Sequence, residues 1–435
     1  MTNRRSWGVA AALLGACASA WADWPQFLGP TRDGKSPQTG LDRTLGGGQP
    51  KVLWTVQLGE GYGGPAIRDG KVFVLDRQLD ARDVLRCLDL KTGTEQWRTA
   101  YEAPGELAHD GSRSTPAVDE RFVFTVGPFG HFHCISRATR RSVWSKHLLK
   151  DFGAELPKWG VGQSPLLSKG WVVVCPLGAK AGVIACDRAT GKIVWQSAPV
   201  GHRKHSSAFF GWYASVMPGT FGGVEQFLVI TNDRACGLRA SDGKLLWSYT
   251  GRYCKIQIPG PTQIDKDRLF ITGGYLSGSA MLRVTRRGEE FGVEEVYKLG
   301  PRVCGSQTHQ PLLIDGHLYL NSNSNERSDG MMCLTLDGKV KWTTGRSPNF
   351  QRGNLIYADG LIYNLDGRTG ILHLIQPSPD GYKELAQAKL LGGKEIWAPM
   401  AISDGMLVLR DQSQMKCIRV RADSQETQPG GAEDK

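Results

Sequence analysis

The chain has 435 residues, of which 40% are hydrophobic and 22% are charged, and its formal net charge is +11. This ordinary globular composition, enriched in turn-forming and aromatic residues (55 Gly and 13 Trp), is ample for a large core. Beyond residue 22 no segment is apolar enough to span a bilayer, and the basic residues are scattered rather than clustered. Composition therefore argues against a membrane-spanning protein and against a nucleic-acid-binding face.

Residues 1–22 have the features of a secretory signal peptide. A positive start at Arg4 and Arg5 precedes an apolar stretch and the small-residue site Ala20-Trp21-Ala22. These features predict cleavage after Ala22 and a periplasmic or extracellular mature protein. Cys17 ends a sequence, LGAC, that resembles a bacterial lipobox. The alternative is therefore a lipoprotein anchored at Cys17, the one route by which we expect contact with a membrane.

Residues 23–50 are rich in Gly and Pro and show no strong periodicity. We expect them to lie as a strap over the domain that follows.

A hairpin sequence then recurs along the chain. Its clearest copy is ACDRATGKIVW, residues 185–195, in which Gly191 supplies the positive φ of a tight turn before a half-buried strand. Similar segments end at Trp97, Trp144 and Trp247, so that the four tryptophans follow one another at intervals of 47, 51 and 52 residues. A further copy ends at Trp342. A period of this length indicates a repeat architecture.

Each repeat reads as four short strands, and the eighth lacks its fourth. The missing strand is supplied by residues 51–56, which copy the tryptophan strand, including Trp54, without a preceding turn. An N-terminal strand that completes the last repeat closes a ring and leaves no free edge. We therefore predict an all-β, eight-bladed β-propeller of four-stranded antiparallel blades over residues 51–421. We expect the polar tail, residues 422–435, to be disordered.

The ten cysteines do not read as a disulfide framework. Six of them occupy matching strands of successive repeats, which the repeat spacing keeps apart, so we expect small buried core residues. Cys254 and Cys304 lie in linking segments, and a bridge between these two stays open. No Cys/His spacing typical of zinc is present.

The hairpin resembles the tryptophan-docking repeat of the pyrroloquinoline-quinone (PQQ) propeller superfamily, in which each tryptophan packs between adjacent blades. The likeness covers almost the whole mature chain. The N-terminal DWPQFLGPTRDGKSP and the segment GSRSTPAVDERFVFTVGPFGHFHCI further resemble secreted BamB-like proteins of planctomycete-type bacteria. The tryptophans that match the docking position are Trp54, Trp97, Trp144, Trp195, Trp247 and Trp342.

A quinoprotein dehydrogenase of this superfamily would hold PQQ between a Trp and a disulfide of adjacent cysteines, beside a calcium bound by Glu, Asn and Asp. This sequence has no adjacent cysteine pair, the nearest being Cys175 and Cys186, and no other recognised catalytic motif. We therefore expect no catalytic residue, no metal and no cofactor, while PQQ with calcium stays open.

A binding site is expected at the channel mouth, where the segments that enter the innermost strands converge. These entries carry aromatic, Arg, Gln and His residues, which suit a flat polar ligand, a sugar ring or a peptide loop. Packing of the blade entries around a wet channel explains the same residues equally well. The residues predicted to contact a ligand are Arg113, Trp159, Gln163, Trp212, His309, Arg352 and Trp397.

The sequence thus predicts a non-enzymatic, exported binding or scaffold protein that is monomeric. Its expected partner is a cell-envelope protein, which could pair with exposed strand edges, or a small polar or glycan ligand at the mouth. The alternative function is that of a PQQ-dependent, dehydrogenase-like oxidoreductase.

Overall fold

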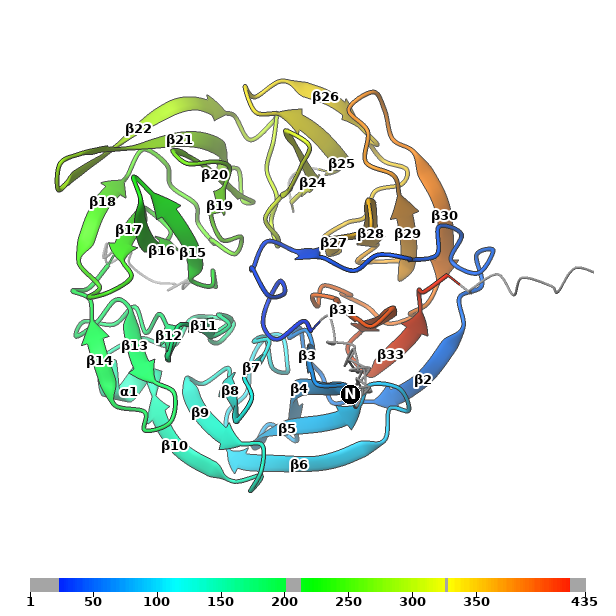
Figure 1. Cartoon of the computed structure of the whole chain (residues 1–435), viewed down its shortest axis with the longest axis horizontal. Coiled ribbons are helices and arrows are strands. Elements are labelled where there is room, and N and C mark those ends of the chain that lie inside the picture. The colour runs from blue at the N-terminus through cyan, green and yellow to red at the C-terminus, as the bar shows by residue number, and fades with distance from the viewer. Residues whose placement is uncertain (1–22, 201–212, 325–327, 423–435) are drawn as a thin grey trace, which may run out of the picture.

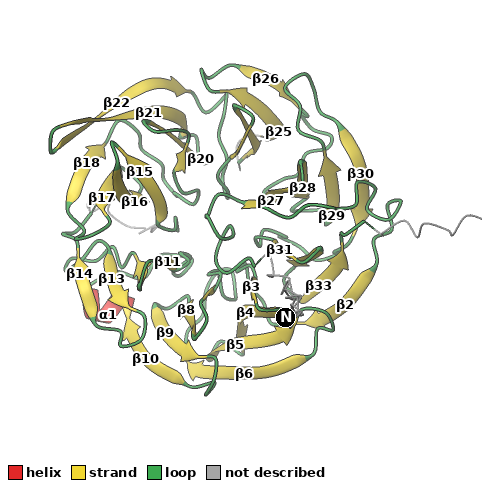
Figure 2. Cartoon of the chain, viewed as in Figure 1, coloured by secondary structure: helices red, strands yellow, loops and turns green. Residues whose placement is uncertain are grey.

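The computed structural model describes residues 23–200, 213–324 and 328–422. Eight sheets of four antiparallel strands stand around a central axis as the blades of a propeller, and the strap adds a fifth strand to one of them (Figure 1). Strands make up almost all of the regular structure (Figure 2), and the helix in the described part, α1 (Leu148–Phe152), is a single short turn. No described helix has the length and apolar character needed to cross a bilayer. The predicted all-β, eight-bladed fold is confirmed.

Within each blade the strands run antiparallel from the channel outward, and in blades 1 to 7 they do so in chain order. Blade 1 consists of β3 (Ala66–Arg68), β4 (Lys71–Gln78), β5 (Arg82–Asp89) and β6 (Glu95–Glu102). Blade 2 consists of β7 (Ala117–Val118), β8 (Phe122–Val126), β9 (His131–Ser136) and β10 (Ser142–His147). Blade 3 consists of β11 (Leu166–Ser168), β12 (Trp171–Val174), β13 (Ile184–Asp187) and β14 (Ile193–Gln196). Blade 4 consists of β15 (Met217–Phe221), β16 (Val224–Ile230), β17 (Ala235–Arg239) and β18 (Leu245–Tyr249).

The second half of the ring repeats this order. Blade 5 consists of β19 (Thr262–Gln263), β20 (Arg268–Gly273), β21 (Gly278–Arg287) and β22 (Glu290–Leu299). Blade 6 consists of β23 (Leu312–Ile314), β24 (His317–Asn323), β25 (Ser328–Thr335) and β26 (Val340–Thr343). Blade 7 consists of β27 (Leu355–Ala358), β28 (Leu361–Leu365), β29 (Ile371–Ile375) and β30 (Glu384–Lys389). Blade 8 consists of β31 (Ala401–Ser403), β32 (Met406–Arg410), β33 (Gln414–Arg419) and β2 (Val52–Gln57).

The ring is closed by a strand from the other end of the chain. β2 pairs antiparallel with β33, and Trp54 lies opposite Cys417. Figure 1 shows this blue strand completing the red eighth blade. The predicted closure is confirmed, and it covers the edge that β33 would otherwise expose.

Burial follows the position of a strand within its blade. In β4 the six central residues of KVFVLDRQ are all buried, because neighbouring blades cover both faces of an inner strand. In β6, the outermost strand of the same blade, burial alternates residue by residue, as expected where one face meets solvent. The core is therefore distributed between the blades around the ring.

A β-bulge precedes the docking position in all eight blades. In the pairing of β10 with β9, for example, the register shifts between Ser142 and Trp144. The bulge leaves Val143 unpaired and turns Trp144 toward the next blade. There the indole Nε1 donates to the carbonyl oxygen of Arg188 at 2.9 Å.

The same contact recurs around the ring, with local variation. Trp54 donates to the carbonyl oxygen of Leu90 at 2.8 Å, and Trp342 to that of Ser378 at 2.9 Å. Trp247 bonds instead to Gln226 of its own blade. Trp97 packs edge-on against Phe73. In blade 5, Tyr297 occupies the docking position and packs against Gly338.

The Nε1 of Trp195 is buried and has no hydrogen-bond partner among the described residues. The ring of Trp195 is instead stacked on Phe227 of blade 4. A tryptophan at the docking position therefore packs between blades even where its N–H finds no acceptor.

Replacing Gly191 with alanine should destabilise the fold more than the same change at Gly316. Both glycines have positive φ, +70° and +72°. A Cβ on Gly191 would lie 2.6 Å from the Trp144 ring, whereas a Cβ on Gly316 would meet nothing within 4 Å. We expect Gly316→Ala to cost about 1–2 kcal/mol of unfolding free energy and Gly191→Ala about 1–3 kcal/mol more. Equal urea midpoints for the two variants would contradict the stacking of Trp144 on this turn.

The nine cysteines in the described part of the chain are buried. The third strands of six blades each carry one, and the six are Cys87, Cys134, Cys186, Cys236, Cys333 and Cys417. Cys254 and Cys304 are also buried thiols, and no disulfide joins cysteines in the described part of the chain. The open question of a bridge between these two is thereby answered in the negative.

The strap, residues 23–50, crosses the face of the ring at which the inner strands end (Figure 1). Trp24 is 1% exposed and pairs through its backbone with Ile67 of β3. Farther along, β1 (Lys35–Ser36) pairs in parallel with β27 of blade 7. The strap thus spans the channel and joins blades that are far apart in sequence.

A buried arginine fastens the strap to the channel wall. Arg32 has no exposed surface, and its two terminal nitrogens donate to the carbonyl oxygens of Pro165 and Ser164 at 2.9 and 3.1 Å. Its guanidinium also lies 5.5 Å from the centre of the Phe27 ring. Burial lowers the pKa of Arg32 to about 9, which leaves it cationic at neutral pH.

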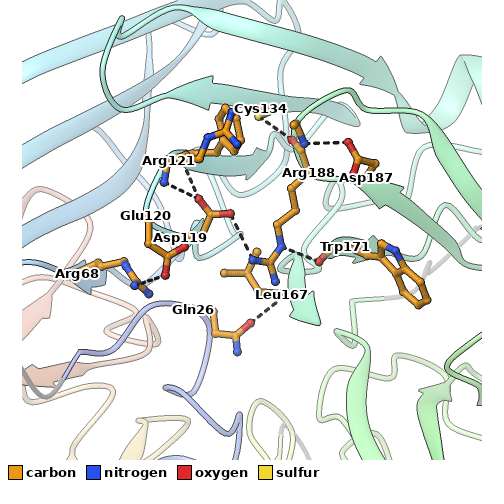
Figure 3. Close-up of polar contacts among 12 residues, drawn as sticks. Gln26, Arg68, Asp119, Glu120, Arg121, Cys134, Leu167, Trp171, Asp187 and Arg188 are labelled. Carbon is orange, nitrogen blue, oxygen red and sulfur yellow. Dashed lines mark hydrogen bonds and ion pairs between the residues drawn. The ribbon is translucent and has the colours of Figure 1, made fainter. Parts of the chain in front are cut away.

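Polar contacts at the same face tie the strap to blade 3 and tie blade 3 to blade 2 (Figure 3). Gln26 of the strap accepts the backbone N–H of Leu167 at 3.0 Å. Arg188 of blade 3 donates to the carbonyl oxygen of Trp171 at 3.0 Å and pairs with Asp119 of blade 2 at 3.4 Å. The carbonyl oxygen of Arg188 also accepts the indole N–H of Trp144. Arg188 therefore connects the tryptophan docking contact to this polar network.

Candidate functional site

A cavity lies at the opposite face, where the chain enters the inner strands. Each entering segment comes from the outermost strand of one blade and begins the innermost strand of the next, so eight such segments converge on the axis. The cavity has a volume of about 310 Å³, and we call it the cup. It is lined by Phe27, Tyr62, His109, Arg113, Trp159, Gly162, Ser164, Tyr213, Ser215, Ile258, Tyr275, Gln307, Thr308, Arg352, Asn354, Glu395, Trp397 and Pro399.

Part of the lining is a row of two aromatic rings and two guanidinium groups, which we call the stack. Its members are Arg352, Trp397, Tyr62 and Arg113. The ring centres of Tyr62 and Trp397 lie 5.5 Å apart with an interplanar angle of 28°. The guanidinium of Arg352 lies 5.1 Å from the centre of the Trp397 ring, and that of Arg113 lies 5.5 Å from the centre of the Tyr62 ring. The four residues come from the segments that enter blades 7, 8, 1 and 2. The stack therefore spans the point at which the ring closes.

One carboxylate is held beside the stack. The hydroxyl of Tyr62 donates to Oε2 of Glu395 at 2.5 Å, and Nδ1 of His109 lies 3.5 Å from the same oxygen. Burial and the hydrogen bond to Glu395 both raise the pKa of Tyr62, so its hydroxyl stays protonated at neutral pH. Oε1 of Glu395 is not part of these contacts and can accept a hydrogen bond from a ligand.

Arg113 is positioned by its own segment. It donates to the carbonyl oxygen of Gly111 at 2.6 Å and to that of His109, and both partners are neutral. Burial lowers the pKa of Arg113 to about 10, so the side chain remains cationic at neutral pH. The cup therefore keeps a positive charge that these two carbonyl groups do not neutralise.

The facing wall holds a second aromatic pair. The ring centres of Trp159 and Tyr213 lie 5.6 Å apart, and the backbone N–H of Trp159 donates to the Tyr213 hydroxyl at 3.2 Å. Burial raises the pKa of Tyr213 to about 12. The edge of His109 meets Trp159 at 5.9 Å and joins this pair to Glu395 and the stack.

Buried amides complete the lining between blades 5 and 7. Gln307 is 5% exposed and donates through Nε2 to the Tyr275 hydroxyl at 3.0 Å, while its Oε1 is buried without a hydrogen-bond partner among the described residues. Asn354 is 4% exposed, and its Oδ1 likewise has no partner in the described part of the chain. If either amide were rotated, a polar atom would still be left unsatisfied, and such buried groups are costly unless something binds them.

The structure brings together four of the residues predicted to contact a ligand, Arg113, Trp159, Arg352 and Trp397. Gln163 lies outside the lining, since its side-chain amide bonds to both the N–H and the carbonyl of Cys175. His309 is 4% exposed and also lies behind the lining, with Nδ1 3.1 Å from the carbonyl oxygen of Gln310. Trp212 lies outside the described residues.

His309 should make the protein less stable in acid. Burial lowers its pKa to about 4, below the ordinary value of about 6.5. Between pH 6.5 and 4 the unfolded state binds the extra proton, so stability present above pH 6.5 falls as the pH drops, by up to about 3 kcal/mol. The variant His309→Gln should show a flatter pH profile than the parent protein in urea denaturation. Parallel profiles for the parent and His309→Gln would contradict this assignment.

Among the lining residues that were missed from the sequence, three are instructive. Phe27 reaches the cup from the strap, which no repeat pattern connects to the channel mouth. Tyr275 lies in the turn between β20 and β21, not in an entering segment. His109 lies four residues before the predicted Arg113, in the same entering segment, and this position could have drawn attention to it. The turns between second and third strands also face the mouth, which was the signal overlooked for Tyr275.

The cup does not fit PQQ with calcium. Trp397 and Tyr62 cover each other on one face and are approached by guanidinium groups, so neither ring offers an open stacking face. The lining has a single carboxylate, Glu395, whereas calcium takes six to eight oxygen ligands. No cysteine lines the cup, and the described residues contain no group of three or more His, Cys, Asp and Glu side chains that could hold a metal ion.

Comparison with solved structures places the fold among several kinds of protein. A europium-containing methanol dehydrogenase matches with a TM-score of 0.63 and 13% identity, over 91% of this chain and 89% of its own. The quinohemoprotein alcohol dehydrogenase of Comamonas testosteroni matches with a TM-score of 0.60 and 12% identity, over 94% and 82% of the two chains. BamB from Moraxella catarrhalis matches with a TM-score of 0.57 and 13% identity, over 85% and 99%. At such identities these likenesses show the fold alone.

No curated protein sequence matches the chain. Residues 81–344, more than half of the chain, match the family described as outer membrane protein assembly factor BamB. The repeated docking tryptophans, the eight closed blades and this match lead to one conclusion: the chain belongs to the BamB-like family of PQQ-repeat β-propellers.

Proposed function

We propose that the chain is a non-enzymatic binding protein of the cell envelope that holds a small polar ligand in the cup. The observation that carries this proposal is the lining itself, in which buried amides, two arginines and paired aromatic rings from nearly every blade surround one cavity. Ligand sites are typically concave and largely apolar, with a few polar groups that fix orientation. The cup combines these properties on a rigid ring.

Hydroxyl groups in the lining serve the scaffold. Oγ of Ser164 accepts the backbone N–H of Thr115 at 3.0 Å, and Oγ of Ser215 accepts the backbone N–H of Ser164 at 2.8 Å. Thr308 donates to the carbonyl oxygen of Arg352 at 3.1 Å. A catalytic nucleophile needs an adjacent base, and these hydroxyls are instead bonded to backbone groups of neighbouring segments. The arrangement favours holding a ligand over transforming it.

Export, through cleavage after Ala22 or lipidation at Cys17, is part of the same proposal, as is a monomeric state. A protein partner that pairs with the outer strand edges is compatible with a ligand in the cup, because the two surfaces lie at different places on the ring. The competing function is a PQQ-dependent oxidoreductase, which the dehydrogenases among the structural neighbours bring into consideration.

Thermal denaturation with a panel of small ligands tests the proposal. The panel contains neutral and acidic sugars, hydroxy acids, amino acids, nucleotides and PQQ. A ligand at about 100 times its Kd adds about 2.7 kcal/mol to folding stability and raises the Tm. We expect at least one class to do so, and we expect Arg352→Gln to lose the shift while Arg346→Gln keeps it. Arg346 is the matched control, since it is exposed on the segment that enters the same blade and does not line the cup.

If no member of the panel raises the Tm, or if the shift persists unchanged in Arg352→Gln, the cup is not the binding site.

A further inference from the structure

The charge of the lining indicates the charge of the ligand. Two guanidinium groups, of Arg113 and Arg352, line the cup against the single carboxylate of Glu395. Because the rings of Tyr62 and Trp397 are stacked on each other, their edges are the parts left to meet a ligand. Aromatic edges carry partial positive charge, whereas the faces are negative. Guanidiniums and ring edges together favour an anion.

The buried amides set a second requirement. Oε1 of Gln307 and Oδ1 of Asn354 are acceptors that lack a partner among the described residues, and Oε1 of Glu395 is a further acceptor. Carbonyl and carboxylate oxygens can be satisfied only by N–H or O–H donors. A simple inorganic anion or an aromatic carboxylate without hydroxyl groups would leave these oxygens unsatisfied, at a cost in affinity.

Size gives the third requirement. A volume of about 310 Å³ lies at the lower end of the range of ligand pockets, roughly 300–1,000 Å³. The cup suits one small molecule, such as a single sugar ring. The residue Phe27, from the strap at the far end of the channel, also lines the cavity and limits its depth.

From these three requirements we infer that the cup binds a polyhydroxylated carboxylate, an acidic sugar of the hexuronate type. The carboxylate is bound by Arg352 at one end of the stack, and the ring hydroxyls donate to Gln307, Asn354 and Glu395. This inference rests on the proposed function and narrows the ligand to one chemical class.

Isothermal titration calorimetry with galacturonate and its neutral counterpart galactose tests the inference. We expect galacturonate to bind the unmodified protein at least tenfold more tightly, since the two sugars differ only in the carboxylate and a charge-assisted hydrogen bond is stronger than a neutral one. Its affinity should fall with added salt, and that of galactose should not.

Two variants distinguish the contact to the sugar's carboxylate from the contacts to its hydroxyl groups. Arg352→Gln should bring the affinity for galacturonate down to that for galactose, whereas Asn354→Ala should weaken both sugars by a similar factor. Arg346→Gln is the control and should change neither. Circular dichroism and a thermal melt establish that each variant is folded. If Arg352→Gln is not folded, Arg352→Met replaces it, because methionine removes the charge and keeps an unbranched apolar side chain.

Equal binding of the two sugars would overturn the inference and leave the proposed function intact. Binding of neither sugar would also overturn the inference, and the ligand panel would then decide the proposed function separately. If Arg352→Gln retains the full preference for galacturonate, the carboxylate does not lie at Arg352 and the inference is wrong.

Discussion

Replacing Trp54 with alanine should lower the free energy of unfolding by about 3–5 kcal/mol. Trp54 is 7% exposed, donates to the carbonyl oxygen of Leu90 and packs against Gly93 in the next blade. It is also the docking residue of the strand that closes the ring, so its loss leaves a cavity at the closure and weakens the pairing of β2 with β33. Urea denaturation followed by circular dichroism measures the change.

Trp54→Phe is the control that separates packing from hydrogen bonding. It keeps an aromatic ring but removes the N–H donor, which leaves the Leu90 carbonyl without this bond, and we expect a loss of about 1–2 kcal/mol. If Trp54→Ala unfolds at the same urea concentration as the parent protein, the N-terminal strand does not hold the ring closed.

Replacing Trp24 with alanine should release the strap and destabilise the protein by a similar amount, about 3–5 kcal/mol. Trp24 is 1% exposed and belongs to the cluster of buried side chains that joins blades 1, 7 and 8. Its ring also lies against the backbone of Gly29, where a Cβ would approach within 3.0 Å. Hydrogen exchange followed by mass spectrometry should show faster exchange of the backbone amides of Trp24 and Ile67, which are now bonded to each other's carbonyls.

Leu79→Ala is the matched control, because this apolar side chain is 95% exposed and its removal leaves no cavity. It should leave both stability and exchange unchanged. Unchanged exchange at Ile67 in Trp24→Ala would show that the strap is held by other contacts.

The fold was predictable because its signal repeats. The docking tryptophans and turn glycines recur in chain order, and the copy of their strand around Trp54 has no turn before it, which is enough to indicate closure. Even the weak fifth repeat keeps an aromatic residue, Tyr297, at the docking position, and the structure places it against Gly338 as the pattern requires. Repetition fixes the fold because each blade must bury the same faces as its neighbour.

The cup was predictable only in part, because the direction in which a side chain points does not repeat from one entering segment to the next. Arg352 and Trp397 face the axis, whereas Gln163 turns back to bond both backbone groups of Cys175. His309 is likewise turned into the wall. The stack could not be predicted from the sequence, because its pairs join segments from opposite ends of the chain, such as Tyr62 and Trp397.

In the proposed function, the cup is a ligand site that does not bind PQQ. A tryptophan-fluorescence titration with PQQ, with and without calcium, tests this claim most directly. Trp159 and Trp397 line the cavity, so an aromatic ligand there would quench their emission. We expect no saturable quenching under either condition, because the stack leaves no open face on Trp397 and a single carboxylate lines the cup. Saturable, calcium-dependent quenching accompanied by dye-linked oxidation of an alcohol would contradict this expectation and identify the protein as a quinoprotein oxidoreductase.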